Sequence, residues 1–518
     1  MKFTNYYVSL GDKFFQRVLP QKVPLPKLLL WNSELANSLL ISEKLQNNHE
    51  QLSQYFSGNK LFDGAEPIAL AYSGHQFGHF NPQLGDGRAH LLGEVFDKQS
   101  TRCDIQLKGS GQTPFSRRGD GKCALAPALR EYIMSEALFA LGVPTSRCLA
   151  VVSTGETINR GLAKPGAVVT RVAASHIRVG TFQYFAARGD TDSLKSLLNH
   201  CIDRHFPEMN SSQMSEEQRI LAFLEQAIDK QITLIIQWLR VGFIHGVMNT
   251  DNTAISGETL DYGPCAMMGS YDEKAVFSSI DEYARYAFGN QGKIAQWNMA
   301  RLADCLLPLL LDCGAESSDG TSSEKEQEQL ALQKVEALIH QYSGKFDEAY
   351  YAMYAKKLGL GEVNADSKLL VDDLLAIMQR HGLDYTKTFY LLTQSLSNAE
   401  QGKRLQTELD DWYDTWLSAL KNTNLNSQQN YLKHGQKIMG ENNPIVIPRN
   451  HHVEAILARC EDVVTDNSSP QMLKEAVNNI VGEFLSVLRS PYHEVNATKN
   501  YQDTPKDDDK YYQTFCGT

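Results

Sequence analysis

The sequence has no excess of positive charge, no long apolar run and no paired-cysteine motif. Its 518 residues carry a formal net charge of −11, which argues against a general nucleic-acid or anionic-membrane binder, because such proteins present a basic face. The apolar runs 234–236 and 306–311 are far too short to cross a bilayer. The N-terminus has Lys2 but no apolar segment of the secretory-signal type. We therefore expect a cytoplasmic protein that binds neither nucleic acid nor membrane.

The nine cysteines are scattered, and none forms a C-x-x-C pair. A cysteine-based structural zinc site is therefore not indicated, and the odd count with wide spacing is typical of a reducing compartment. Cys516, third from the end of a polar tail, is the cysteine that we expect to be accessible. Because exposed thiols are the reactive ones, both a redox role and an unreactive tail thiol stay open.

The most informative stretch combines HGVMNTDN (245–252) with DYG (261–263). Protein kinases carry H-R-D-x-x-x-x-N followed by D-F-G, whose Asn and second Asp hold metal ions on the nucleotide phosphates. On that template Asn252 and Asp261 fall on the two metal ligands. Val247 stands where kinases carry the catalytic aspartate. The pattern therefore predicts metal-assisted phosphate chemistry without the usual base.

Asp251 is a candidate for the missing base. A hydroxyl nucleophile needs a carboxylate within hydrogen-bond reach to accept its proton. In this stretch the only carboxylates before Asp261 are Asp251 and Glu258. Mg²⁺ prefers oxygen ligands such as those of Asp and Asn. The same residue types are also common in ordinary turns, so this stretch alone leaves that reading open.

Two glycine-rich loops precede this stretch. In LGDGR, Gly85 and Gly87 allow backbone N–H groups to approach an anion and Arg88 adds charge. A hairpin turn is the alternative for this loop. In TPFSRRGDGK, Asp120 and Gly121 belong to a charged turn that is either a solvated loop or a second anion-binding loop.

Lys108 and Glu131 are predicted to form an ion pair. Residues 104–108 alternate as a strand does and end at Lys108. A helix is predicted over 126–141, and Glu131 lies on one of its apolar lines. A buried carboxylate needs a partner, and Lys108 is the obvious one, as in the Lys–Glu pair of kinases. A surface lysine is the alternative.

Arg171 and Arg178 are the next candidate phosphate contacts. The segments 146–156 and 166–174 are predicted strands, and Arg178 follows Arg171 by seven residues. Arginines hold phosphates bidentately, although surface arginine is the commoner fate. Residues 190–240 are predicted to be helical, with a capping box of Ser215 and Gln218.

With these pieces in order, the sequence resembles the selenoprotein O family over most of its length. The resemblance rests on the following segments: YSGHQFGHFNPQLGDGR (72–88), QLKGSGQTPFSRRGDG (106–121), REY (130–132), SEALFALGVPT (135–145), HGVMNTDN (245–252), LDYGP (260–264), NP-x-x-IPRNH (443–451) and the terminal CGT. It implies an α+β, protein-kinase-like two-lobed fold that binds ATP in an inverted orientation. It also implies transfer of AMP to Ser, Thr or Tyr hydroxyls of proteins.

The resemblance also implies roles for individual residues. Asp251 is the implied proton acceptor, Asn252 and Asp261 are the implied ligands of Mg²⁺ or Mn²⁺, and Glu131 is the implied partner of Lys108. The implied nucleotide contacts are Gly85, Gly87, Arg88, Lys108, Asp120, Gly121, Arg171, Arg178 and Asp261.

The expected organisation has four parts. These are an N-terminal extension (1–60), a kinase-like N-lobe with the nucleotide loops (61–165), a kinase-like C-lobe with the catalytic and metal loops (166–345) and a mostly helical C-terminal region with a Cys-bearing tail (346–518). Residues 314–328 are polar and are expected to be a flexible insertion.

Several alternatives stay open. UMP transfer from UTP by the same site is the nearest, because nothing in the sequence reads the base, and an inactive nucleotide-binding scaffold is another. Ordinary phosphotransfer is disfavoured by Val247. Family members often carry a redox cysteine near the C-terminus; Cys516 matches it, and Cys265 is a potential partner for a regulatory disulfide.

Overall fold

The computed structural model describes residues 1–211, 213–317, 324–422, 431–465, 470–505, 509 and 511–515. The strands are β1 Phe15–Arg17, β2 Lys27–Trp31, β3 Ile68–Leu70, β4 Gly74–Gln76, β5 His79–Asn81, β6 Ala89–Phe96, β7 Arg102–Lys108, β8 Cys123–Ala124, β9 Arg147–Asn159, β10 Ala163–Ala173, β11 Phe243–Ile244 and β12 Ala266–Met267. The helices are α1 Ser33–Ser38, α2 Glu43–Gln46, α3 His49–Phe56, α4 Leu125–Ala140, α5 Val179–Ala186, α6 Thr191–His205, α7 Glu216–Val241, α8 Gln291–Ser317, α9 Glu324–Lys357, α10 Ala365–His381, α11 Tyr385–Ser395, α12 Ala399–Leu409, α13 Asp411–Asn422, α14 Tyr431–Asn442, α15 Asn450–Thr465 and α16 Pro470–Leu488.

An antiparallel sheet in the order β1-β3-β6-β7-β10-β9-β2 forms the N-terminal part, with β8 paired to β10. Neighbouring residues of its central strands point to opposite faces, as the two-residue period of a strand requires. Val151 and Val169 join the core that includes α4, whereas Val152 and Val168 join the core under α1 and α3. The middle of the sheet is therefore buried on both faces.

The first sixty residues contribute directly to this sheet. β1 pairs with β3 and β2 pairs with β9, so both edge strands come from the segment that the sequence suggested as an extension. β2 buries Leu28, Leu29 and Leu30. These three residues do not alternate between apolar and polar, because both faces of this edge strand are covered and side chains on either face are buried.

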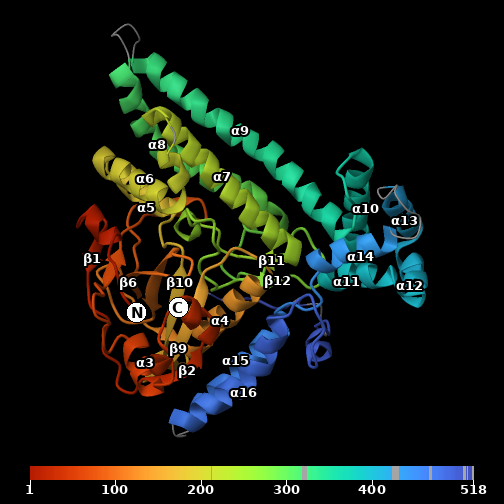
Figure 1. Ribbon diagram of the computed structural model, residues 1–518, viewed down its shortest axis with the longest axis horizontal. Helices are drawn as coiled ribbons and strands as arrows, with labels where there is room; N and C mark the ends of the chain where they lie inside the picture. The colour runs from red at the N-terminus through yellow and green to blue at the C-terminus, as the bar shows by residue number, and fades with distance from the viewer. Residues whose placement is uncertain are drawn as a thin grey trace.

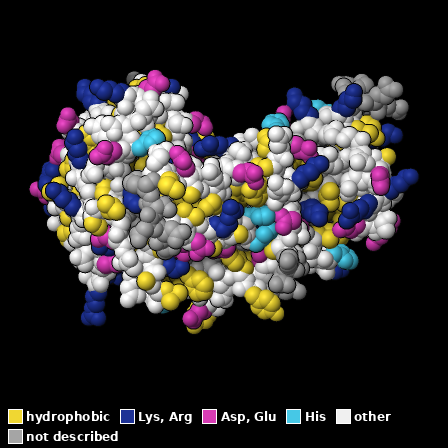
Figure 2. All heavy atoms as spheres, turned by 90° about the horizontal axis from the view of Figure 1, so that it is seen from below, with side chains coloured by type: hydrophobic (Ala, Val, Ile, Leu, Met, Phe, Trp, Pro, Cys, Tyr) yellow, Lys and Arg dark blue, Asp and Glu magenta, His cyan; other side chains and the backbone are white. Residues whose placement is uncertain are grey.

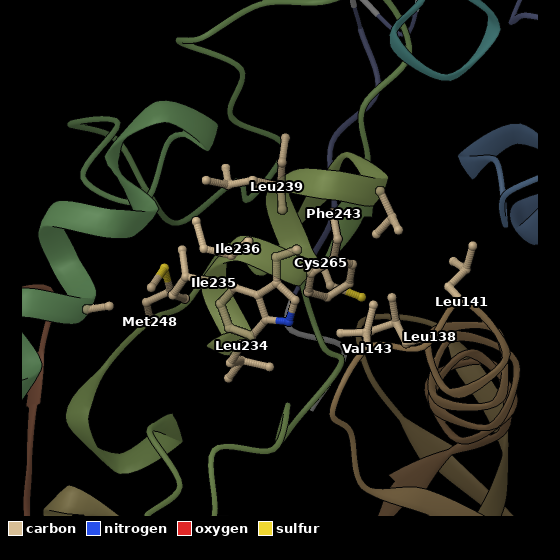
Figure 3. Close-up of a cluster of buried hydrophobic side chains, with 14 of the residues drawn as sticks. Leu138, Leu141, Val143, Leu234, Ile235, Ile236, Leu239, Phe243, Met248 and Cys265 are labelled. Atoms are coloured by element: carbon tan, nitrogen blue, oxygen red, sulfur yellow. The ribbon is translucent and has the colours of Figure 1, made fainter. Parts of the chain in front are cut away.

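Helices α7, α8 and α9 pack together beyond the sheet, and α10 to α14 form a further helical group (Figure 1). α7 begins at the predicted capping box, in which Ser215 and Gln218 each bond the other's backbone N–H, and it ends at Gly242 in the left-handed conformation. Figure 3 shows Leu138, Leu141 and Val143, at the end of α4 and just after it, beside Leu234 to Leu239 of α7. This contact joins the sheet region to the helical region through one continuous core.

The last helices return to the sheet. α15 packs on α4, and α16 packs on both α4 and β2 (Figure 1). The Asn478 side chain donates to the backbone carbonyl of Leu29 at 3.1 Å. The C-terminal region is thus bound to the first strands of the chain and is not a separate appendage of the helical group.

The architecture is mixed α/β, with a sheet in the N-terminal region and helices in the C-terminal region. The prediction of a flexible insertion over 314–328 is wrong at both ends of that range, because α8 continues to Ser317 and α9 begins at Glu324. Residues 318–323 lie outside the described part of the chain. Within the described part of the chain, no helix is long and apolar enough to span a membrane. Acidic and basic side chains are interspersed on the face drawn in Figure 2.

Candidate active site

A cavity of about 650 Å³ opens between the sheet and the loops that follow α7. Its size is within the usual range of small-ligand sites. Eight Lys and Arg side chains line it, against four Asp side chains, in a protein whose net charge is −11. The cations are Arg88, Lys108, Arg117, Arg118, Lys122, Arg160, Arg171 and Arg178, and the acids are Asp86, Asp120, Asp251 and Asp261. The local excess of positive charge favours a polyanionic ligand.

The two glycine loops pack against each other at the mouth of this cavity. Gly85 has φ +80°, and a Cβ there would lie 2.2 Å from Phe115 Cγ. A Cβ at Gly87 would lie 2.9 Å from the Phe115 carbonyl oxygen. Gly121 has φ +69° and touches the Gly111 backbone. Glycine is therefore required for the loops to meet, whether or not they also hold an anion.

Strand β7 and helix α4 place Lys108 and Glu131 in a buried ionic network. Lys108 Nζ lies 2.8 Å from Glu131 Oε2 and 2.7 Å from Asp261 Oδ1. Arg171, on the neighbouring strand β10, binds Glu131 through two guanidinium nitrogens and lies 3.1 Å from Asp261 Oδ1. Two cations and two carboxylates therefore satisfy one another, as buried charges must.

The carboxylates of this network are held ionised by their partners. Burial alone would raise the pKa of Asp261, but Lys108 and Arg171 lower it well below its usual range. Burial likewise opposes ionisation of Glu131, and Arg171 with Lys108 outweighs it, so the pKa of Glu131 is also lowered. Glu131 is 3% exposed, whereas the side chain of Asp261 is 22% exposed, on the cavity side. Asp261 is thus an anion that a ligand in the cavity can reach.

The loop after β11 supplies Asp251 and Asn252. Gln76 Nε2 donates to Asp251 Oδ2 at 3.2 Å, and Asp251 Oδ1 is shielded from solvent with no hydrogen-bond partner among the described residues. Desolvation raises the pKa of Asp251 to about 6. Asn252 Nδ2 donates to the Val247 carbonyl at 3.0 Å, and Asn252 is among the residues that line the cavity. Val247 itself lines the cavity and offers no titratable group.

His245 has a positioning role in this loop. Its Nε2 lies 3.0 Å from the Leu260 carbonyl, immediately before Asp261, and its ring stacks on Trp238 of α7 at 5.1 Å between centroids. Burial lowers the pKa of His245, so the imidazole is neutral. The histidine thereby ties the Asn252 loop to the Asp261 loop.

Arg178 lines the cavity, and its contacts there are with residues that are distant in the sequence. It lies 3.2 Å from Asp86 Oδ1, and its guanidinium lies 4.1 Å from the Tyr72 ring centre. Asp86 also accepts from Gln106 Nε2 at 3.1 Å. The sequence reasoning missed Asp86, although its place between Gly85 and Gly87 was a signal.

Asp120 is bound by a residue that the sequence reasoning also missed. Arg160, from the turn between β9 and β10, donates to both Asp120 oxygens at 2.8 Å. Nothing in the local sequence marks Arg160, because its partner is forty residues away and the pairing depends on the sheet. Arg88 also lines the cavity. All the predicted nucleotide contacts are thus among the residues that line it.

Of the two cysteines expected to pair, the structure describes Cys265 only. Cys265 is fully buried, its Sγ lies 3.4 Å from the Tyr262 carbonyl, and desolvation raises the pKa of the thiol to about 11. Cys516 lies outside the described residues. The tail nevertheless approaches this loop, because Thr514 Oγ1 donates to the Pro264 carbonyl at 2.6 Å.

The oxygen donors at one end of the cavity fit a hard divalent cation. Asp261 contributes a carboxylate, Asn252 an amide oxygen, and Asp251 Oδ1 is unpartnered within the described part of the chain. None of these donors is an imidazole or a thiolate, so the set suits a hard divalent cation better than a soft one.

Comparison with known proteins gives a consistent result. The family model described as "Protein adenylyltransferase SelO" matches residues 1–480. Proteins named "Protein nucleotidyltransferase YdiU" from Teredinibacter turnerae and Pseudoalteromonas translucida are 47% and 46% identical over 518 residues, covering 100% of both chains in each case. A protein of that name from Anoxybacillus flavithermus is 44% identical over 516 residues, covering 100% of this chain and 99% of its own. The chain therefore belongs to the SelO family of protein nucleotidyltransferases, and it is an enzyme of that class.

Proposed function

We propose that the enzyme transfers AMP from ATP to Ser, Thr or Tyr hydroxyls of proteins and releases diphosphate. The observation that carries this proposal is the cavity that collects eight cationic side chains around Asp251 and Asp261. A triphosphate needs such a surface, because its charge must be balanced where water is excluded. The name of the relatives, "Protein nucleotidyltransferase YdiU", supports nucleotide transfer, and the description of the family model, "Protein adenylyltransferase SelO", supports AMP as the transferred group.

In this proposal the cations hold the phosphates and Lys108 is the central one. Lys108 lines the cavity, and its ammonium is held by Glu131, which is in turn bound by Arg171. Arg178 provides a second, planar contact suited to phosphate oxygens. The diphosphate leaving group carries the charge that these side chains stabilise.

Asp251 is proposed as the proton acceptor. The acceptor hydroxyl oxygen attacks the α-phosphorus, the bond from that phosphorus to the bridging oxygen of the diphosphate breaks, and the hydroxyl proton passes to Asp251 Oδ1. That oxygen has no hydrogen-bond partner among the described residues, and Asp251 is one of the residues that line the cavity. Val247 cannot accept a proton, which separates this site from a kinase site.

Asn252 and Asp261 are proposed to hold Mg²⁺ or Mn²⁺. The metal, when bound, neutralises charge on the phosphates. Asp261 is suited to this because the lowered pKa keeps it anionic. Its present partners Lys108 and Arg171 share one oxygen, Oδ1.

We also propose that the sheet region and the helices after it are the two lobes of a kinase-like architecture. The cavity lies between them, with Lys108 and Glu131 on the sheet side and Asn252 and Asp261 on the helical side. The proposed parts 1–60, 61–165, 166–345 and 346–518 follow this arrangement only in outline, because β1 and β2 of the first part belong to the sheet and β10 crosses the boundary at 165.

The test is the mass of an acceptor protein after incubation with equimolar ATP and UTP and with Mg²⁺ or Mn²⁺. We expect a mass increase equal to one or more AMP groups. An increase equal to UMP would replace the nucleotide in the proposal. Absence of any transfer, with ATP binding shown separately, would support an inactive scaffold.

A further inference from the structure

Two histidines and an aspartate form a cluster that is separate from the residues lining the nucleotide cavity. His451 and His452 stand in the first turn of α15, and Asp503 follows the short helical turn Thr498–Tyr501 in the tail. One ligand atom of each residue lies within 4.8 Å of the others, and among the described residues this is the one such group of three His, Cys, Asp or Glu side chains. None of the three lines the nucleotide cavity.

His451 is the member of this group with unpartnered ligand atoms among the described residues, whereas His452 and Asp503 are hydrogen-bonded to each other. His452 Nε2 lies 2.7 Å from Asp503 Oδ1, and His451 Nε2 lies 3.4 Å from Asp503 Oδ2 without forming a hydrogen bond. Both ring nitrogens of His451 are shielded from solvent and have no hydrogen-bond partner in the described part of the chain. A polar side chain left in this state costs free energy unless something binds it.

The two rings are held in place by their surroundings. Their centroids lie 4.1 Å apart, and His452 packs edge-on against Tyr501 at 5.1 Å and beside Phe484 of α16 at 6.2 Å. Burial lowers the pKa of His452, and the neutral imidazole is the form that ligates metals.

The donor set selects a class of metal. Two imidazole nitrogens and one carboxylate suit Zn²⁺ and its first-row neighbours, whereas Mg²⁺ and Ca²⁺ prefer oxygen alone. Tetrahedral bonds of about 2.1 Å place ligand atoms roughly 3.4 Å apart, close to the separation of His451 Nε2 and Asp503 Oδ2. The lack of C-x-x-C pairs excludes only a cysteine-based zinc site.

We propose that His451, His452 and Asp503 form a binding site for Zn²⁺ or a similar transition-metal ion that fastens the C-terminal tail to α15. The tail is also attached further on, where Asp509 accepts from Asn450 at 2.9 Å and Tyr512 donates to Glu454 at 2.8 Å. Beyond these contacts, Thr514 reaches the Pro264 carbonyl. The metal site is the first of these attachments, and it sets where the tail departs toward the Asp261 loop.

The test is a Zn²⁺ titration of the full-length protein against a chelating indicator, in excess Mg²⁺ so that the oxygen donors near Asp261 are occupied. We expect one tightly bound Zn²⁺ per chain. His451→Gln and Asp503→Asn should each weaken binding at least tenfold. His381→Gln, which changes an exposed histidine at the end of α10, is the matched control and should leave binding unchanged. Equal affinity in the wild type and both site variants would refute the site.

A measurement on the wild type alone covers the case in which a variant misfolds. X-ray absorption at the zinc edge should show two imidazole ligands, and a shell of oxygen alone would refute the assignment. Zn²⁺ should also slow proteolysis of the tail beyond residue 503 in the wild type. These experiments measure Zn²⁺ binding, the type of ligand and cleavage of the tail. Their results therefore do not depend on whether the protein transfers a nucleotide.

Discussion

Lys108 and Asp261 form an ion pair of 2.7 Å that joins strand β7 to the loop after β11. The residues are 153 positions apart, and the lysine is 6% exposed. Glu131 holds the same ammonium at 2.8 Å from the opposite side. The contact links the side of the cavity that we assign to phosphate binding with the side that we assign to the metal.

Glu131→Gln should lower both the stability and the nucleotide affinity. The change leaves Lys108 and Arg171 with a single carboxylate, and breaking a buried pair costs about 3–5 kcal/mol. Chemical denaturation measures the stability and calorimetry with ATP measures the affinity. Glu136→Gln is the matched control on the same helix, because buried Glu136 binds Arg147 through two bonds and does not line the cavity. It should lower stability alone. If both variants bound ATP like the wild type, Lys108 would not depend on Glu131 for its position.

Asp251→Asn should slow transfer by about 10²–10⁴-fold, the usual contribution of a positioned general base. Nucleotide affinity should be retained, because Asn keeps the shape of the side chain and the cations are untouched. Single-turnover transfer and ATP binding measure the two quantities separately. A variant that transfers at the wild-type rate would move the proton acceptor to another group.

Asp261→Asn should reduce metal-dependent transfer by at least about 100-fold, as expected when a ligand to the metal is removed. Chelation of divalent metal from the wild type should have the same effect, and added Mg²⁺ or Mn²⁺ should restore activity. Asp384→Asn is the control, because this buried aspartate pairs with Arg449 away from the cavity. Full activity of Asp261→Asn across metal concentrations would contradict the ligand assignment.

Glu258 should make stability depend on pH. Burial raises the pKa of Glu258 to about 7, and its hydrogen bonds from Ala174 N and Ser256 Oγ only partly offset this. Since the folded-state pKa lies above the unfolded value of about 4.3, the contribution to stability is complete below pH 4.3 and is lost as pH rises through 7. The loss reaches at most about 4 kcal/mol.

The measurement is the free energy of unfolding from pH 4 to pH 8 for the wild type and for Glu258→Gln. The glutamine variant cannot ionise at this position, so the difference between the two curves should grow in the variant's favour as pH rises. A constant difference over this range would show that Glu258 ionises normally in the folded protein.

The parts of the site that sequence reasoning could reach were those with a local physical signature. Glu131 was identifiable because a carboxylate on an apolar helix line needs a partner, and the structure places Lys108 Nζ within 2.8 Å of it. The strands around 104–108, 146–156 and 166–174 were identifiable from their two-residue period, and β7, β9 and β10 occupy those positions. The capping box of Ser215 and Gln218 was readable from letters three apart and is confirmed.

The parts that were missed depend on contacts between distant segments. Arg160 pairs with Asp120 across forty residues, and only the folded sheet brings them together. Residues 1–60 were expected to be an N-terminal extension. The strands β1 and β2 in this segment are only three to five residues long, which is too short to show a clear periodicity. The polar run at 314–328 suggested flexibility, but charged residues such as Glu324 also cap and begin helices, as they do in α9. The pairing of His451 with Asp503 has no sequence signal at all.

The most direct test of the central claim uses ATP labelled at either the α- or the γ-phosphate, with the full-length enzyme, an acceptor protein and Mg²⁺ or Mn²⁺. The account predicts that the α-label becomes covalently attached to protein, that the γ-label leaves as diphosphate, and that Asp261→Asn abolishes the attachment. Attachment of the γ-label instead would mean phosphotransfer by a site that lacks an aspartate at Val247, and it would contradict the proposed nucleotidyl transfer.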